Sequence, residues 1–389
     1  MAKKPNIRFA GFEDDWEQRK VGDITKELSE YAKLNSGLPL LTSARTGLMY
    51  QSDYRGNSTT DNENTLFSIV PLNACTYRHM SDDSTFHINV NTLEKGLVSK
   101  EYPVFVENES DLRFVVQYIN SSDSFTKFCT EQKKGGTRTR LYYKTLCEYK
   151  MLIPSLNEQH IIADYFDNLD HLITLHQRKC DELKKVKKFM LQKMFPKKGE
   201  KNPEIRFDGF TNDWEQRKVY EMFKVTRGYV LPATDTSEEI SDEMPYPVYS
   251  SQTKDNGLMG YYSDYLYEDA ITWTTDGANA GTVNFRYGRF YCTNVCGVLL
   301  SDKVEASKAV AEALNNVAKR YVSYVGNPKL MNNVMADIQI KIPTSREERA
   351  KISSYFSNLD HLITLHQRKC EELKNVKKYM LQNMFAKGE

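Results

Sequence analysis

Two segments of this chain each occur twice. IRFAGFEDDWEQRKV at residues 7–21 returns as IRFDGFTNDWEQRKV at 205–219, and the 28 residues at 168–195 return at 358–385 with four substitutions. The stretches between the copies have little in common. A repeated frame with two unlike inserts predicts two related supports for two different recognition surfaces. Because the second pair of copies is nearly identical, we expect one kind of partner to bind both through pseudo-two-fold symmetry.

The second repeated segment has the heptad spacing of apolar residues that predicts a long amphipathic helix, from about residue 158 to 194. Such a helix would be about 55 Å long, too long to be buried inside either insert. We therefore expect the two copies to pack on each other as an antiparallel coiled coil. The residues predicted to form its widened seam or to bind a partner are Leu169, Leu172, His176, Leu183, Val186, Met190, Leu359, Leu362, His366, Leu373, Val376 and Met380.

Helix start signals precede both copies. Ser155 or Asn157 is the predicted cap of the first helix, directly after Pro154. Thr344 or Ser345 is the predicted cap of the second.

Two features of the repeated helix admit more than one interpretation. His176 and His366 fall in or near the seam, where a metal ion is conceivable. No cysteine or carboxylate stands at ligand spacing beside them, so hydrogen-bonded seam histidines are favoured and no metal site is predicted. From residue 169 to 201 there are ten Lys or Arg against four acidic residues. This basic stripe is either a surface for phosphates or a solvated helix face.

The inserts, residues 22–150 and 220–341, consist of short apolar and aromatic runs broken by Gly, Asn, Asp and Pro, which is typical of strands and turns. Helical intervals fall at 110–120 and 306–325. The predicted fold class is α+β, with two globular domains joined by two long helices packed as an antiparallel coiled coil, with internal pseudo-two-fold symmetry. The predicted strands lie at 65–70, 103–106, 247–250, 270–274 and 296–300. The predicted segments are a first recognition domain at 1–150, a central helical region at 151–204, a second recognition domain at 205–341 and a C-terminal helical region at 342–389.

Loops of both inserts carry side chains suited to reading base edges. EQKKGGTRTRL at 131–141 places basic residues around a Gly pair, and an arginine can fork onto guanine while lysines and backbone amides take phosphate. TWTTDGANAGTVN at 272–284 and SSQTKDNG at 250–257 supply hydroxyl, carboxylate and amide groups. The alternative is that Gly and Asn merely build tight turns there. The candidate DNA-binding residues are Arg45, Lys133, Lys134, Thr137, Arg138, Arg140, Gln252, Lys254, Thr275, Asp276 and Asn279.

Composition and missing motifs limit the functional classes. The net charge is +1, with 40% hydrophobic and 27% charged residues, as in an ordinary globular protein. We expect a cytoplasmic protein, because no apolar run approaches 18 residues, MAKKPNIRF has no signal-peptide core, and seven scattered cysteines suit a reducing compartment.

Motifs of independent catalysis are also missing. The sequence has no GxxxxGK[ST] loop for ATP, and NPKL at Asn327 is not the Asn-Pro-Pro-aromatic tetrapeptide of amino-methyltransferases. Cys292 and Cys296 lack a second ligand pair and are interpreted as strand cysteines rather than a zinc site. We therefore expect a non-catalytic chain.

The frame and the loops together resemble a known family, the specificity subunits of type I restriction-modification systems. The resemblance covers nearly the whole chain, from residue 7 to 385. It is carried by FxGFxxDWEQRKV at Phe9 and Phe207, by GGTRTRLYYKTL before IPSLNEQ at Ile153, and by TTDGANAGTV followed by TNVCGVLL in the second insert. The paired NLDHLITLHQRK helices complete it, and the order of variable domain and repeated helix is its most specific feature.

The resemblance implies a function in host defence. Each target-recognition domain would read one half of a bipartite site in double-stranded DNA, and the helices would set the unread spacer between the halves. Two modification subunits would attach to the repeated regions and bring S-adenosylmethionine. Two restriction subunits, which are motor nucleases, would bring ATP and Mg. The chain itself would bind no cofactor, would perform no catalysis and would have no membrane partner.

The expected mechanism is direct base contact through the major groove by both domains, about one helical turn of DNA apart. Because the net charge is near zero, the chain alone should bind DNA weakly and with strong salt dependence. Two other classes remain open: a coiled-coil scaffold that presents two ligand-binding domains to partners other than DNA, and a diverged DNA methyltransferase or nuclease.

Overall fold

The chain divides into two compact units, and each contains one globular domain and part of both long helices. Unit 1 is Met1–His176 with Lys369–Glu389, and unit 2 is Gln177–Arg368. The long helices are α6 (Leu156–Lys193) and α10 (Arg346–Asn383), each of 38 residues, which confirms the two predicted helices. The computed structural model describes residues 4–55, 64–133, 137–251 and 254–386.

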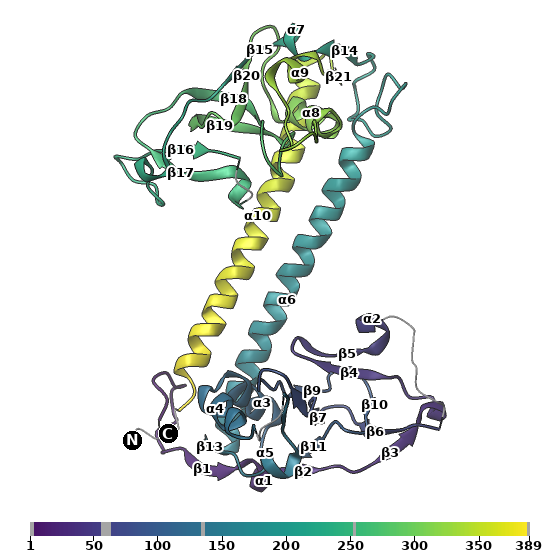
Figure 1. Ribbon diagram of the computed structural model, residues 1–389, viewed down its shortest axis with the longest axis vertical. Helices are drawn as coiled ribbons and strands as arrows, with labels where there is room; N and C mark the ends of the chain where they lie inside the picture. The colour runs from purple at the N-terminus through teal and green to yellow at the C-terminus, as the bar shows by residue number, and fades with distance from the viewer. Residues whose placement is uncertain (1–3, 56–63, 134–136, 252–253, 387–389) are drawn as a thin grey trace. The chain divides into compact units, whose positions relative to one another are not determined.

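The globular part of unit 1, domain 1, is made of small antiparallel sheets and short helices (Figure 1). Its elements are β1 (Glu17–Lys20), α1 (Val21–Ile24), β2 (Thr25–Glu27), β3 (Tyr31–Lys33), η1 (Leu34–Ser36), β4 (Leu41–Ala44), β5 (Gly47–Tyr50), α2 (Gln51–Arg55), β6 (Leu66–Val70), β7 (Cys75–Thr76), β8 (Met80–Ser81), β9 (Asn89–Val90), β10 (Gly96–Ser99), β11 (Val104–Glu107), α3 (Leu112–Ser121), α4 (Asp123–Glu131), β12 (Thr139–Arg140), α5 (Tyr143–Leu146) and β13 (Lys150–Ile153). The largest sheets have the orders β2-β11-β7-β9 and β10-β6-β3. Smaller pairs are β1–β13, β12–β8 and β4–β5.

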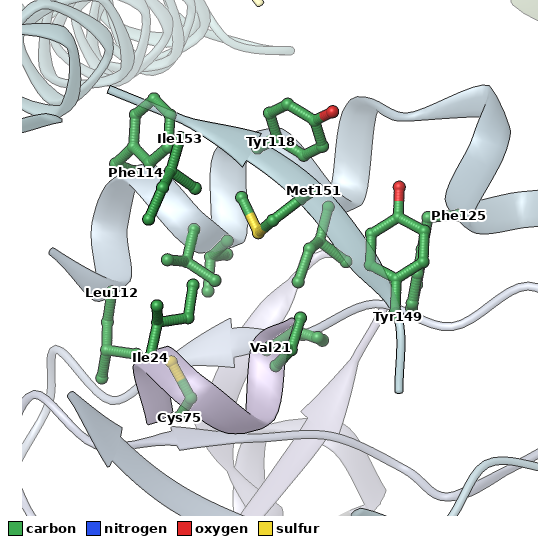
Figure 2. Packing of buried hydrophobic residues seen from close by; sticks show 14 of the residues in the cluster. Val21, Ile24, Cys75, Leu112, Phe114, Tyr118, Phe125, Tyr149, Met151 and Ile153 are labelled. Carbon is green, nitrogen blue, oxygen red and sulfur yellow. The ribbon is translucent and has the colours of Figure 1, made fainter. Parts of the chain in front are cut away.

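The core of unit 1 joins domain 1 to both long helices. Figure 2 shows Phe114 and Tyr118 of α3 near Met151 and Ile153 of β13, above Val21 and Ile24 of α1. Phe385, just after α10, packs on the ring of Phe114 at 5.5 Å and stacks on Phe166 of α6 at 5.7 Å. These aromatic contacts anchor the long helices in the same apolar cluster as domain 1.

The globular part of unit 2, domain 2, is built on one six-stranded sheet of order β15-β20-β18-β19-β16-β17. Its elements are β14 (Glu215–Lys218), α7 (Val219–Met222), β15 (Phe223–Arg227), η2 (Ala233–Asp235), β16 (Tyr246–Tyr249), η3 (Lys254–Gly257), β17 (Leu258–Tyr262), β18 (Tyr267–Thr274), β19 (Val283–Cys292), β20 (Cys296–Ser301), α8 (Lys308–Ala318), η4 (Lys319–Tyr321), α9 (Asn332–Asp337) and β21 (Gln339–Ile342). Only the β16–β19 pair is parallel among the named strands. The sheet is tightly packed, because a Cβ at Gly297 would lie 2.1 Å from the ring of Trp273.

Most predicted elements of the inserts are confirmed. The five predicted strands correspond to β6, β11, β16, β18 and β20, and the helix predicted at 110–120 corresponds to α3. The helix predicted at 306–325 is too long, since α8 ends at Ala318 and η4 ends at Tyr321. The chain leaves the helix because Ser323 pairs with Lys329 in an antiparallel bridge, which the left-handed Gly326 (φ 78°) allows.

The repeated segments form the same local structure in both units. β1 pairs with β13 in unit 1, and β14 pairs with β21 in unit 2, both antiparallel. The backbone N–H of Ile7 donates to the carbonyl of Asn383 at 2.9 Å, and Ile205 donates to Lys193 in the same way at 2.9 Å. The end of one long helix therefore meets the start of a repeated segment in each unit.

A buried ion pair ties each repeated segment to the start of a long helix. Arg8 donates through Nε and Nη2 to the two carboxylate oxygens of Glu158, at 2.7 and 2.8 Å, and Arg206 binds Glu348 at the same distances. Both glutamates are 1% exposed. Two parallel bonds between a planar guanidinium and a carboxylate fix both position and orientation.

The two long helices run antiparallel within each unit. In unit 1, Lys377 of α10 donates to Asp170 of α6 at 2.7 Å, and Cys370 lies against Ile173. In unit 2, Lys187 of α6 donates to the equivalent Asp360 of α10 at 2.6 Å. A polar residue at a seam position selects one register, because a shift of either helix separates the pair.

The seam is narrower than predicted. Its buried or half-buried residues alternate four and three positions apart, through Leu169, Ile173, His176, Cys180 and Leu183 and their α10 counterparts. Leu172, Val186, Leu362 and Val376 were predicted in the widened seam, but their side chains are 40–44% exposed. The reason is geometric: the next residue along the helix, Ile173, Lys187, Ile363 or Lys377, is rotated about 100° toward the other helix and takes the seam position.

The buried ion pair generates a prediction about stability. Glu158→Gln removes the charge that compensates Arg8, so the free energy of unfolding of unit 1 should fall by about 2–3 kcal/mol. Glu348→Gln should do the same in unit 2. Denaturant unfolding followed by hydrogen exchange of each unit measures both effects. Glu268→Gln, which removes an exposed carboxylate 3.4 Å from Arg289, is the control; an equally small effect of Glu158→Gln would contradict the prediction.

Candidate nucleic-acid interface

Four exposed arginines gather around the β8–β12 pair of domain 1. Met80–Ser81 pair with Thr139–Arg140, and the loop after β8 carries Asp82 and Asp83. Arg138 donates through Nε to Asp82 at 2.8 Å. Arg45, from the turn between β4 and β5, donates to Asp83. We name this surface the arginine edge: Arg45, Arg78, Arg138 and Arg140.

Asp83 is the most firmly held acid of the arginine edge. It accepts from the hydroxyl of Ser81 at 2.7 Å and from the backbone N–H of Thr85 at 3.1 Å, in addition to Arg45. The hydrogen bonds from Ser81 and Arg45 hold the pKa of Asp83 well below its usual range. The group is therefore ionised, and each of Asp82 and Asp83 neutralises one of the four arginines.

An aromatic pair lies beside the arginines. The Tyr142 ring, 54% exposed, stacks on His79 at 5.8 Å. Burial, with smaller contributions from the charges of Arg140 and Arg78, lowers the pKa of His79, so its imidazole is neutral near pH 7. A flat ring next to guanidinium groups is a common feature of nucleic-acid surfaces. Arg78, His79 and Tyr142 were not among the predicted residues. The run YRHM at 77–80 lies beside TRTRLYY through the β8–β12 pairing, and the sequence alone does not indicate that pairing.

In domain 2 the two predicted loops meet at one end of the six-stranded sheet. Asn279 donates through its amide to the carbonyl of Ser251 at 3.5 Å, a weak bond that joins them. Arg286, 9% exposed, stacks on Tyr249 at 3.7 Å and donates to the carbonyl of Asn256 at 2.7 Å. Asp255 and Asn256 have positive φ angles of 48° and 53°, so this turn is held in a strained shape by the buried arginine.

A third loop of domain 2 supports the same region. Residues 323–329 form a short hairpin, and its Lys329 pairs with Asp276, with 3.5 Å between their charged groups. Tyr324 and Val325 near its tip are 71% and 93% exposed. This hairpin was not predicted, because the helix predicted at 306–325 included its first three residues.

The predicted DNA-binding residues are not all exposed at one surface. Arg45, Arg138 and Arg140 come together at the arginine edge, whereas Lys133 and Thr137 are exposed on either side of residues 134–136. Thr275 is 7% exposed and donates to the carbonyl of Val295 at 2.9 Å, so it supports its loop, while Asp276 and Asn279 are half-buried at the surface. Lys134, Gln252 and the side chain of Lys254 lie outside the described residues.

The described residues provide little for metal or thiol chemistry. No group of three or more His, Cys, Asp or Glu in these residues is placed to hold a metal ion. His176 and His366 are half-buried in the seam. Cys292 and Cys296 are buried strand residues, and burial raises the pKa of Cys296 to about 11, so its thiol stays protonated. Within the described ranges, no helix has the length and apolar character needed to cross a membrane.

Comparison with known proteins agrees with this architecture. The model of the type I restriction modification DNA specificity domain matches residues 82–185 and 211–375. The putative type I specificity subunit S.MpnORF289P N-terminus of Mycoplasma pneumoniae is 37% identical over 140 residues, which are 35% of this chain and 73% of the relative. The putative subunit S.MpnORF507P of the same organism is 35% identical over 166 residues, 42% of this chain and 44% of the relative.

A solved structure shares the fold. The crystal structure of the type I restriction-modification S subunit from M. genitalium has a TM-score of 0.71 to this chain, with 16% identity, and the match covers 99% of this chain and 100% of the other. Two unlike α+β domains on a repeated pair of long helices define a class of two-domain recognition proteins. The chain belongs to the type I restriction-modification DNA specificity family. It is a non-catalytic DNA sequence-specificity subunit that acts within a complex.

The buried Arg286 generates a prediction about domain 2. Arg286→Met leaves the carbonyl of Asn256 and the hydroxyl of Thr272 without their donor, so the free energy of unfolding of unit 2 should fall by about 2–3 kcal/mol. The turn at 254–257 should then lose its shape. Thermal unfolding and proteolysis at this turn measure the change. The exposed Arg289→Met is the control, and equal behaviour of the two variants would show that Arg286 does not hold the turn.

Proposed function

We propose that domain 1 and domain 2 each read one half of a bipartite site in double-stranded DNA. The observation that carries the proposal is the pairing of a repeated frame with two chemically different polar surfaces. Domain 1 offers the arginine edge, and domain 2 offers Asp276, Asn279 and the turn at 254–257. Unlike surfaces on equivalent supports predict two unlike half-sites.

Direct contact in the major groove accounts best for the groups present. An arginine can donate two parallel N–H bonds to guanine O6 and N7, and an amide such as Asn279 can pair with adenine. Lys133 and the other exposed cations of domain 1 would contact phosphates, so affinity would fall steeply with salt. With a net charge of +1, the chain would bind DNA weakly until partner subunits close around it.

The long helices carry a surface suited to such partners. In unit 1, exposed apolar side chains project from both helices: Leu172 and Leu175 of α6, Val376 and Tyr379 of α10. They occupy the heptad positions that flank the seam on one side. In an antiparallel pair, the flanking positions of one helix lie next to those of the other. We name this set, 40–57% exposed, the unit 1 stripe.

Unit 2 repeats this surface. Leu362 and Leu365 of α10 with Val186 and Phe189 of α6, 40–52% exposed, form the unit 2 stripe. Apolar residues gathered on an exposed helix face mark a contact site. We propose that each stripe docks one modification subunit, so that the complex holds two. These subunits would supply S-adenosylmethionine, two restriction subunits would supply ATP and Mg, and the helices would set the spacer between the half-sites.

Sequencing of methylated sites tests the function most directly. Cells that express the chain with its modification subunits should carry methyl groups at one bipartite sequence with two different halves. A scaffold for other ligands would give no methylated sequence. A methyltransferase or nuclease would act on DNA as the purified chain alone with Mg and S-adenosylmethionine, whereas we expect that DNA to stay uncut and unmethylated.

The stripes generate a prediction about stoichiometry. Leu175→Ser with Tyr379→Ser should remove one modification subunit and leave the other, because only the unit 1 stripe loses its apolar surface. Phe189→Ser with Leu365→Ser should remove the other subunit, and the four changes together should remove both. Native mass spectrometry of the complex counts the subunits. Lys184→Ser with Lys374→Ser, on the opposite edge of the helix pair, is the control; loss of both subunits from either two-residue variant would contradict two independent sites.

A further inference from the structure

We propose that Asp82 and Asp83 are positioning residues, which orient Arg138 and Arg45 to read guanine in the half-site of domain 1. The proposal rests on the proposed function of the arginine edge. It adds that base discrimination there depends on two acidic residues that would not themselves contact DNA.

The bond between Asp82 and Arg138 leaves the reading end of the arginine available. Asp82 accepts from Nε of Arg138 at 2.8 Å, and the Arg138 side chain is 53% exposed. Within the described part of the chain, neither terminal amino group of Arg138 has a hydrogen-bond partner. Those two groups are a fork that can match O6 and N7 of guanine. Holding Nε therefore orients the fork without occupying it.

The carboxylate of Asp83, which binds Arg45, is itself held by two further hydrogen bonds. The hydroxyl of Ser81 and the backbone of Thr85 fix its carboxylate, as described above, and Ser81 itself belongs to β8. Arg45 stands in the turn between two paired strands, and among the described residues it donates through one terminal amino group, to Asp83. The contact joins the β4–β5 turn to the loop after β8, so it sets where the Arg45 guanidinium lies relative to Arg138.

Two physical effects would follow from this arrangement. A free arginine side chain samples many rotamers, and a bound carboxylate reduces that freedom before DNA arrives, so less entropy is lost in recognition. A carboxylate next to the guanidinium also repels phosphate, so the held arginine is less available to the sequence-independent DNA backbone. The first effect increases discrimination between bases, and the second lowers affinity for random DNA.

The alternative is that the two acids only reduce the positive charge of the surface. Both interpretations predict that Asp82→Asn and Asp83→Asn raise affinity for random DNA. Only orientation predicts a loss of discrimination, because an amide side chain does not hold a guanidinium as a carboxylate does. Discrimination and affinity must therefore be measured separately.

The experiment is selection from a duplex library by the assembled complex with its modification subunits. Binding of each library sequence is counted by sequencing, with wild type, Asp82→Asn and Asp83→Asn compared at one salt concentration. We expect each variant to lose about tenfold preference for guanine at one position of the first half-site, a size typical of one bidentate contact. Preferences in the second half-site and the unfolding temperature should not change.

Two further variants make the result decisive. Glu101→Gln removes the same charge from an exposed residue whose charge acts on the nearby His79, and it should leave discrimination intact. In an Arg45→Ala background, Asp83→Asn should have no further effect on preference, since the acid acts through that arginine. If the aspartate variants behave like Glu101→Gln, or if Arg45→Ala and Arg138→Ala keep the wild-type preference, the proposal is wrong. If the wild-type complex selects no sequence, the proposed function itself fails.

Discussion

The register between α6 and α10 is the constraint on which the rest of the structure depends. Asp170 with Lys377 in unit 1, and Lys187 with Asp360 in unit 2, are equivalent pairs from the repeated segment. An apolar seam alone would accept a shift of one heptad with little loss, whereas a half-buried lysine without its aspartate would be costly. The pairs therefore let the nearly identical segments specify one antiparallel arrangement in both units. The buried Arg8–Glu158 and Arg206–Glu348 contacts then fix the start of each long helix to the repeated segment that contains β1 or β14.

The position where the near identity of α6 and α10 begins is explained by the contacts between the helices and the domains. Domain 1 holds the first turns of α6 through Arg113, which binds Asp164 and Asp167 at 2.6 and 2.9 Å. The aligned positions in α10 are serines, and there domain 2 uses a hydrogen bond between Tyr287 and Ser357. The near identity begins at Asn168 and Asn358, directly after these attachments. The helices thus differ at these two attachments, and their near-identical part forms the seam and exposes the stripes.

Much of this could be predicted from the sequence, because repeats and heptads report geometry directly. The two helices, their antiparallel pairing, five strands of the inserts and the Arg138 and Arg140 cluster all followed from local pattern. What could not be predicted depended on contacts between distant residues. The partners Asp82 and Asp83 of the arginine edge required the pairing of β8 with β12, the role of Arg286 required the fold of the sheet, and the hairpin at 323–329 was hidden by helix-compatible residues before Gly326. Leu172 and Val186 are exposed because the next residue of the helix takes the seam position. The spacing of apolar residues does not distinguish two such neighbouring positions.

The central claim is that equivalent frames carry independent readers, and one hybrid chain tests it. Residues 220–357 are replaced by residues 22–167, so that domain 1 and the helix turns it binds occupy both positions. Methylated sites are then sequenced in cells that express the hybrid with the modification subunits. The account predicts a bipartite site whose two halves are the same sequence in inverted orientation, both equal to one half of the wild-type site. A direct repeat, or an unchanged wild-type site, would contradict it.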